Sequence, residues 1–270
     1  MKHFGKCALC GKECNLSFEH IPPESAFNNS PAKPVSGDKL VEDDDRMPWD
    51  TSGLKYEHQQ RGMGKYSLCR DCNSFTGVYY GKAYTYIARI MHVTLHEEID
   101  PKYNAVGIKD IYPLRFIKQV FSMFCSINNS NDSRFDDLRA FVLDKNAVGI
   151  DKAKYKICMY FTKSNLTKYA SFSVLLKQTS VGLESMAVSE ITAYPLGFIL
   201  YFNPTDSWEY DGFDITSFTD YNYDDKFTFE FPLCIKEVND FFPTFFRTKE
   251  EIRECIETNK KWAEENTKED

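Results

Sequence analysis

Four cysteines in two short pairs are the residues of this chain best suited to hold a metal ion. Cys7 and Cys10 form one pair, and Cys69 and Cys72 form the other, each with two residues between them. A Cys-x-x-Cys unit presents two thiolates from one tight turn, so two such units complete a tetrahedral site for Zn2+. Four thiolates leave no open coordination position. The sequence therefore predicts one structural Zn2+ bound by Cys7, Cys10, Cys69 and Cys72.

Three polar side chains lie close to these cysteines in the sequence. Glu19 and His20 follow the first pair, and Asn73 follows Cys72 directly. A neutral imidazole can take a proton from water near neutral pH. Carboxylate and carboxamide oxygens are the ligands that Mg2+ and Mn2+ prefer. These are the groups needed to hold a hard metal ion and to activate a water molecule.

Taken in this order, the residues from Cys7 to about Tyr80 resemble the HNH endonuclease family with its ββα-metal fold, in a form stapled by zinc. The resemblance implies that His20 is the general base and that Glu19 and Asn73 hold a catalytic Mg2+ or Mn2+. The implied activity is hydrolysis of phosphodiester bonds in DNA, and the implied setting is bacterial or phage defence or genome processing.

Three features differ from the usual family pattern. Glu19 stands where Asp is more usual, the interval from His20 to Cys69 is longer than in compact members, and no residue matches the middle Asn of the family name. These differences favour an alternative, a catalytically inactive zinc-stapled module that binds nucleic acid or protein. Asn73 also has an alternative role, because Asn is a favoured N-cap and a helix is expected to begin here.

The pairing of Glu19 with His20 raises a geometric question. Adjacent residues of a strand point to opposite faces of a sheet, so these two can act together only where the strand ends or twists. Pro22 and Pro23 are expected to end the strand just after His20, because proline lacks a ladder donor and restricts the residue before it. We therefore expect His20 to lie at a rigid strand end, oriented by a hydrogen bond from one ring nitrogen to a backbone carbonyl.

The net charge of −7 is unevenly distributed along the chain. Residues 1–96 carry 12 Lys and Arg against 11 Asp and Glu, whereas residues 97–270 carry 21 against 29. Positive charge gathers near the second cysteine pair. The candidate phosphate contacts are four basic residues, Arg61, Lys65, Arg70 and Lys82. For each of them, ordinary solvated surface charge is the alternative interpretation.

The sequence predicts an α+β fold of two domains. The resemblance implies an HNH-like nuclease domain over residues 1–96, and residues 97–270 are expected to form an accessory domain of mixed helices and antiparallel strands. Residues 24–64 are predicted to be an inserted loop, and residues 97–112 a polar connection. Helices are predicted after residue 72, from 113 to 127, from 135 to 143 and from 248, and strands at 155–162, 171–177, 186–193, 196–203 and 226–231.

Composition also bounds the location and the partners of the chain. Nine cysteines are an odd number, and those outside the two pairs are scattered, which favours free thiols in a reducing, cytoplasmic setting. No apolar run is long enough to span a bilayer, so no membrane partner is expected. DNA is expected to contact residues 1–96. The acidic residues 97–270 are expected to support self-association or to bind a protein.

Overall fold

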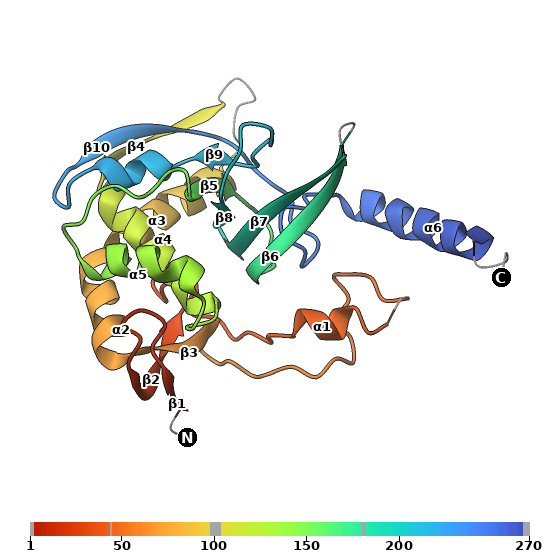
Figure 1. Cartoon of the computed structure of the whole chain (residues 1–270), viewed down its shortest axis with the longest axis horizontal. Coiled ribbons are helices and arrows are strands. Elements are labelled where there is room, and N and C mark those ends of the chain that lie inside the picture. The colour runs from red at the N-terminus through yellow and green to blue at the C-terminus, as the bar shows by residue number, and fades with distance from the viewer. Residues whose placement is uncertain (1–2, 44, 98–103, 180–181, 267–270) are drawn as a thin grey trace.

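The N-terminal part of the chain forms a three-stranded antiparallel sheet followed directly by a helix. The computed structural model describes residues 3–43, 45–97, 104–179 and 182–266, and the whole has an α+β fold with antiparallel sheets (Figure 1). The first sheet has the order β1-β2-β3. Its strands are β1 (His3–Lys6), β2 (Glu13–His20) and β3 (Gly64–Cys69).

A nearly continuous helical segment follows β3. It consists of α2 (Arg70–Thr76), a five-residue π-helical turn (Gly77–Gly81) and α3 (Lys82–His96). The buried residues Tyr80, Tyr84, Ile87 and Met91 recur every three or four positions, which is the spacing of one helix face. The predicted helix is thus confirmed. It begins earlier than Asn73, and Cys69 is its N-cap, so the alternative role of Asn73 as the N-cap is wrong.

Helix α4 (Pro113–Ile127) passes through the centre of the molecule. Of its residues only Arg115 is not buried, because α4 is packed on all sides by other elements. The predicted start at Pro113 and the end before Asn128 are confirmed. A turn of 3-10 helix (Ser133–Phe135) and α5 (Asp136–Leu143) follow.

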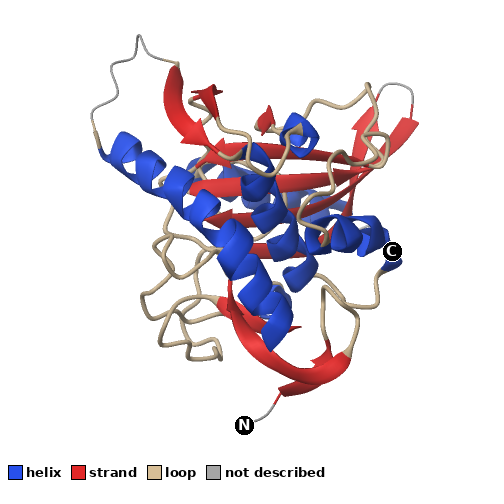
Figure 2. Cartoon of the chain, turned by 90° about the vertical axis from the view of Figure 1, so that its left-hand side faces the viewer, coloured by secondary structure: helices blue, strands red, loops and turns tan. Residues whose placement is uncertain are grey.

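A five-stranded antiparallel sheet makes up most of the remaining structure. Its order is β6-β7-β8-β5-β9, and helices lie across its strands (Figure 2). The predicted strands are confirmed, although two of them are longer than expected. The observed bounds are β5 (Tyr155–Phe161), β6 (Lys168–Thr179), β7 (Gly182–Ala193) and β8 (Leu196–Phe202); the two-residue strand β9 (Phe213–Asp214) was not predicted.

A second, two-stranded sheet corrects one prediction. β4 (Ala105–Ile111) pairs with β10 (Phe227–Pro232), so the polar connection predicted over residues 97–112 is wrong for 105–111; residues 98–103 lie outside the described part. The register jumps between Ile108 and Ile111, where two residues of β4 oppose one of β10. This β-bulge spaces the buried isoleucines three residues apart and hides the alternation typical of a strand.

One hydrophobic core connects the parts before and after residue 96. It runs from Cys7 and Leu68, through Phe121 in α4, to Phe198 in β8 and Phe231 in β10. Hydrogen bonds across the same boundary join Arg139 Nε to the carbonyl of Ala8 at 2.9 Å, and the Tyr169 hydroxyl to the carbonyl of Ile21. The division into two domains stays a prediction, and the two parts pack as neighbours through a shared core.

Two segments extend from the body on the same side (Figure 1). The first is the predicted insertion, which contains the short helix α1 (Gly37–Leu40). The second is α6 (Lys249–Asn266), where the predicted helix is confirmed and reciprocal hydrogen bonds between Thr248 and Glu251 form a capping box. Among the described residues, no helix has the length and apolar character needed to cross a membrane.

Candidate metal centre and catalytic residues

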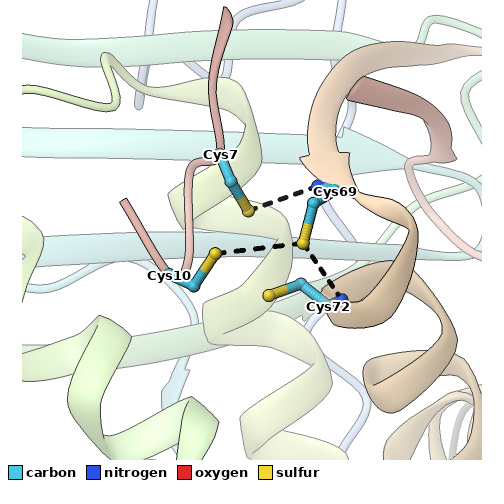
Figure 3. Close-up of side chains that lie close together, drawn as sticks. All are labelled: Cys7, Cys10, Cys69 and Cys72. Carbon is cyan, nitrogen blue, oxygen red and sulfur yellow. Dashed lines mark hydrogen bonds between the residues drawn. The ribbon is translucent and has the colours of Figure 1, made fainter. Parts of the chain in front are cut away.

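The four paired cysteines meet at one point between the N-terminal turn and the start of α2. Their Sγ atoms all lie within 4.8 Å of one another, and Figure 3 shows the sulfurs directed toward a common centre. Sulfurs bound at about 2.3 Å to one tetrahedral ion would lie about 3.8 Å apart. The Sγ atoms of Cys10 and Cys69 are 3.9 Å apart, which fits this value. The tetrad can therefore hold a zinc-type ion.

Backbone N–H groups prepare the sulfurs for this role. The amide of Cys69 donates to Cys7 Sγ at 3.2 Å, and the amide of Cys72 donates to Cys69 Sγ at 3.4 Å. A hydrogen bond from the Cys72 thiol, joined by backbone N–H groups, lowers the pKa of Cys7 to about 4. The same bond raises the pKa of Cys72, so Cys7 is the thiolate and Cys72 keeps its proton. A divalent cation would allow all four to be thiolates.

The two faces of β2 carry different candidate residues. Ser17 and Glu19 point to the face covered by α2, because Asn73 in α2 donates to Ser17 Oγ. Phe18 and His20 point to the other face, where their rings make an edge contact at 5.1 Å. The opposite orientation of Glu19 and His20 is thus present, and β2 ends at His20.

His20 is held by one of its ring nitrogens. Nε2 lies 2.8 Å from the carbonyl oxygen of Arg61, and because a carbonyl only accepts, Nε2 carries the proton. Nδ1 then has the free lone pair and can accept a proton from water. The side chain is partly exposed, which leaves room for that water.

Glu19 is a buried carboxylate that forms no ion pair with a described residue. The residue is 5% exposed, and its side chain forms no hydrogen bond or salt bridge with a described residue. Loss of hydration raises its pKa to about 8. A buried acid with no partner is a costly arrangement in a folded protein, and such groups concentrate at functional sites. A cation at this position would supply the missing charge.

Asn73 is fixed against the strand that carries Glu19. Its Nδ2 donates to the Phe18 carbonyl at 2.9 Å and to Ser17 Oγ at 3.1 Å. Both acceptors precede Glu19 in β2, and the Oδ1 of Asn73 accepts no hydrogen bond from the described residues. A carboxamide oxygen and a carboxylate therefore share one face of the sheet, beneath α2. This donor set suits a hard metal ion such as Mg2+.

Asn28 secures the loop that orients His20, and sequence reasoning missed it. Its Nδ2 donates to the carbonyls of Pro22 and Met63 at 2.6 and 2.7 Å, and its Oδ1 accepts from the amide of Met63 at 2.6 Å. These bonds tie the chain after His20 to the chain after Arg61. Asn28 lies within the inserted segment with no motif around it, so only the folded chain reveals its role.

Gly64 pairs with His20 at the first position of β3, and the backbones approach closely there. A Cβ on Gly64 would lie 2.1 Å from the carbonyl oxygen of Glu19 and 2.8 Å from the Phe18 ring. We therefore expect Gly64→Ala to lower the free energy of unfolding by about 3 kcal/mol, because the clash is with backbone. Gly107→Ala is the matched control, since nothing lies within 4 Å of that Cβ in β4. Equal urea midpoints for the two variants would contradict the prediction.

The four predicted phosphate contacts divide into two kinds. Arg61, Arg70 and Lys82 are exposed and form no ion pair with a described residue. Lys65 differs, because its Nζ donates to the carbonyl of Ile127 at the end of α4 at 3.2 Å. Burial of this ammonium group lowers the pKa of Lys65. Arg61, Arg70 and Lys82 are thus available to bind an anion, whereas Lys65 would first have to break its hydrogen bond to the carbonyl of Ile127.

A cavity lies beside these residues and not on them. It has a volume of about 610 Å3 and lies between the segment after α4 and the start of β6. None of Glu19, His20 or Asn73 lines it. The candidate catalytic residues occupy a strand end and a buried face of the sheet.

Comparison with known proteins gives no match. No protein-family model, no curated protein and no solved structure is significantly similar to this chain.

Proposed function

We propose that this protein is a metal-dependent endonuclease of HNH type that hydrolyses phosphodiester bonds in DNA. The observation that carries the proposal is the arrangement around the cysteine tetrad. The tetrad joins the β1–β2 turn to α2, and α2 in turn holds Asn73 against β2 beside Glu19. The order β2, β3, α2, with His20 at the end of the first of these strands, supports a ββα-metal arrangement stapled by zinc.

Each candidate residue has a defined part in this reaction. His20 takes the proton of the attacking water at Nδ1, while its Nε2–H remains bonded to the carbonyl of Arg61. Glu19 and Asn73 supply the oxygen ligands for Mg2+ or Mn2+. When bound, that ion stabilises the negative charge that develops on the phosphate. Arg61, Arg70 and Lys82 contribute unpaired positive charge for the DNA backbone.

Cleavage of plasmid DNA by zinc-loaded protein tests the proposal. With Mg2+ or Mn2+ added, the wild type should nick or cut the plasmid, and His20→Ala should be slower by about 10^2 to 10^4, the usual contribution of a general base. His58→Ala is the matched control, since His58 is an exposed histidine outside the site. If His20→Ala cleaves as fast as the wild type, His20 is not the base.

One observation favours a second function, a zinc-stapled binding module without hydrolytic activity. Glu19 is only 5% exposed, and none of the candidate catalytic residues lines the cavity of about 610 Å3. The same experiment separates the two functions. A binding module would shift DNA in a gel with or without Mg2+ and leave it uncut, and His20→Ala would change nothing.

A further inference from the structure

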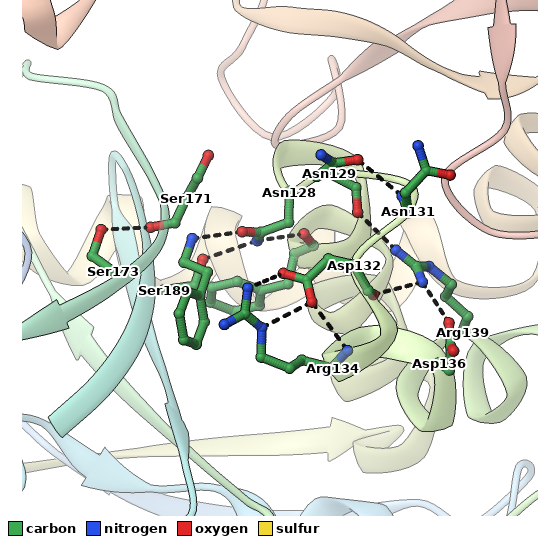
Figure 4. A network of polar contacts seen from close by, with 12 residues as sticks. Asn128, Asn129, Asn131, Asp132, Arg134, Asp136, Arg139, Ser171, Ser173 and Ser189 are labelled. Carbon is green, nitrogen blue, oxygen red and sulfur yellow. Dashed lines mark hydrogen bonds and ion pairs between the residues drawn. The ribbon is translucent and has the colours of Figure 1, made fainter.

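The cavity of about 610 Å3 beside the N-terminal sheet has walls suited to a planar ligand with many hydrogen-bond acceptors. It lies between the α4–α5 connection and β6, and polar side chains line most of it (Figure 4). Asn129, Asn131, Ser133 and Arg134 are exposed to it. Its volume lies in the range of sites that hold a small organic group, and the cavity opens widely to solvent.

Arg134 forms a rigid planar platform in this cavity. Its guanidinium carbon lies 3.4 Å from the centre of the Phe172 ring. Its Nε and Nη2 each donate to a carboxylate oxygen of Asp132 at 2.8 Å. The side chain remains 51% exposed, so the second face of the guanidinium is open to solvent. Planar guanidinium groups held in this way stack on nucleobases.

Hydrogen-bond donors surround the platform. The Oδ1 of Asn129 accepts from the backbone amide of Asn131, and the Oδ1 of Asn131 accepts from Lys6 Nζ at 2.8 Å. Both oxygens are therefore used, while the Nδ2 groups of the two asparagines donate to no described residue. Nη1 of Arg134 likewise donates to no described residue. Free donors next to Lys6 and Arg134 favour a ligand that carries negative charge and many acceptor atoms.

The cavity adjoins the candidate catalytic residues through one lysine. Lys65 is the direct partner of Glu19 across β2 and β3, and its Nζ donates to the carbonyl of Ile127. Ser171, in the cavity wall, donates to that same carbonyl at 3.0 Å. A single side chain thus spans from the strand pair of Glu19 to the edge of the cavity.

We propose that this cavity holds one unpaired nucleotide of the DNA strand, with its base stacked on the open face of Arg134 and its acceptor atoms directed at Asn129 and Asn131. The inference rests on the proposed function and deepens it, because it names unpaired DNA as the form of the substrate. A base inside a duplex cannot enter a cavity, so the strand must be single or the nucleotide must leave the helix.

The inference is tested by binding of a labelled single-stranded oligonucleotide of twelve nucleotides. Binding is measured by fluorescence anisotropy without added Mg2+. Arg134→Ala removes the platform, and Asn131→Asp keeps the acceptor for Lys6 while replacing the donor by a negative charge. Each should weaken binding at least tenfold, since loss of one stacking contact has about that effect. Arg253→Ala in α6 is the matched control. Arg253 also contacts an acid, Glu250, and an aromatic ring, that of Trp49. This variant should bind within twofold of the wild type.

Two further measurements keep the result decisive. Arg134→Lys keeps the charge beside Asp132 but lacks the plane, so intermediate binding supports stacking, and binding equal to the wild type overturns it. An oligonucleotide of abasic residues should bind the wild type about tenfold more weakly, and equal binding overturns the base assignment. Cleavage that persists while pocket variants bind normally would refute this inference alone. Pocket-dependent binding without any cleavage would refute the proposed function alone.

Discussion

Replacing Cys69 by serine should release the structural ion and unfold the N-terminal sheet together with α2. Cys69 acts twice, as a member of the tetrad and as the N-cap of α2. Structural Zn2+ sites in small domains bind with about 10–16 kcal/mol, which is as large as the whole stability of a typical domain. Metal analysis should find one zinc per wild-type chain and none in Cys69→Ser, with thermal unfolding shifted far below that of the wild type.

Cys14→Ser is the control for this experiment. Cys14 lies in β2 near the tetrad but is not one of its four cysteines, and its Sγ donates to the carbonyl of Lys12 at 3.5 Å. The variant should therefore keep one zinc and the wild-type melting temperature. A wild-type protein that is folded and contains no zinc would contradict the predicted site outright.

The sequence predicted the metal centre because each cysteine pair is local. Two residues between Cys69 and Cys72 fix both sulfurs on one turn, whatever the rest of the chain does. Joining this pair to Cys7 and Cys10 needs only that a second such turn be present. The predicted helices and most strands were likewise local, since the helical spacing of apolar residues in α4 and the apolar run of β8 appear directly in the order of the residues.

Features made by distant segments could not be predicted in this way. The hydrogen bonds of Asn28 cross 35 residues to Met63, and the burial of Glu19 depends on α2 and on its neighbours in the core. β4 was missed because its bulge disrupts the alternation. Regional charge does not locate single basic groups. Residues 97–270 are acidic as a whole, yet the cavity that they line contains Arg134, and Asn131 in its wall accepts a hydrogen bond from Lys6 of β1.

Glu19→Gln should make the protein more stable in the absence of Mg2+, although it removes a candidate catalytic residue. The folded structure raises the pKa of Glu19 to about 8, whereas an unfolded chain titrates near 4.5. Between these values the unfolded chain releases a proton that the folded protein keeps. Rising pH therefore favours unfolding, by about 1.4 kcal/mol per pH unit. The ionisation of Glu19 costs the wild type no stability below pH 4.5, and its full destabilising effect is present above pH 8.

Glutamine has a similar shape and does not titrate, so the variant escapes this penalty. At pH 7 we expect Glu19→Gln to exceed the wild type by about 3 kcal/mol, or roughly 5–10 °C in melting temperature for a chain of this length. The difference should shrink toward pH 4.5 and level off above pH 8. Glu13→Gln, an exposed acid at the start of the same strand, is the control and should change neither stability nor its pH dependence.

Addition of Mg2+ should reverse the order of the melting temperatures of the wild type and Glu19→Gln. A cation held by Glu19 and Asn73 stabilises the ionised carboxylate, so the melting temperature of the wild type should rise with Mg2+ and that of Glu19→Gln should not. Cleavage should fall with the same substitution. A variant that is less stable than the wild type at pH 7 would mean that Glu19 has a partner in the folded protein. A variant that responds to Mg2+ as the wild type does would place the ion elsewhere. The ionised carboxylate of Glu19 lowers the stability of the metal-free protein and is the form that would bind a cation. Calorimetry at two pH values can separate these two effects.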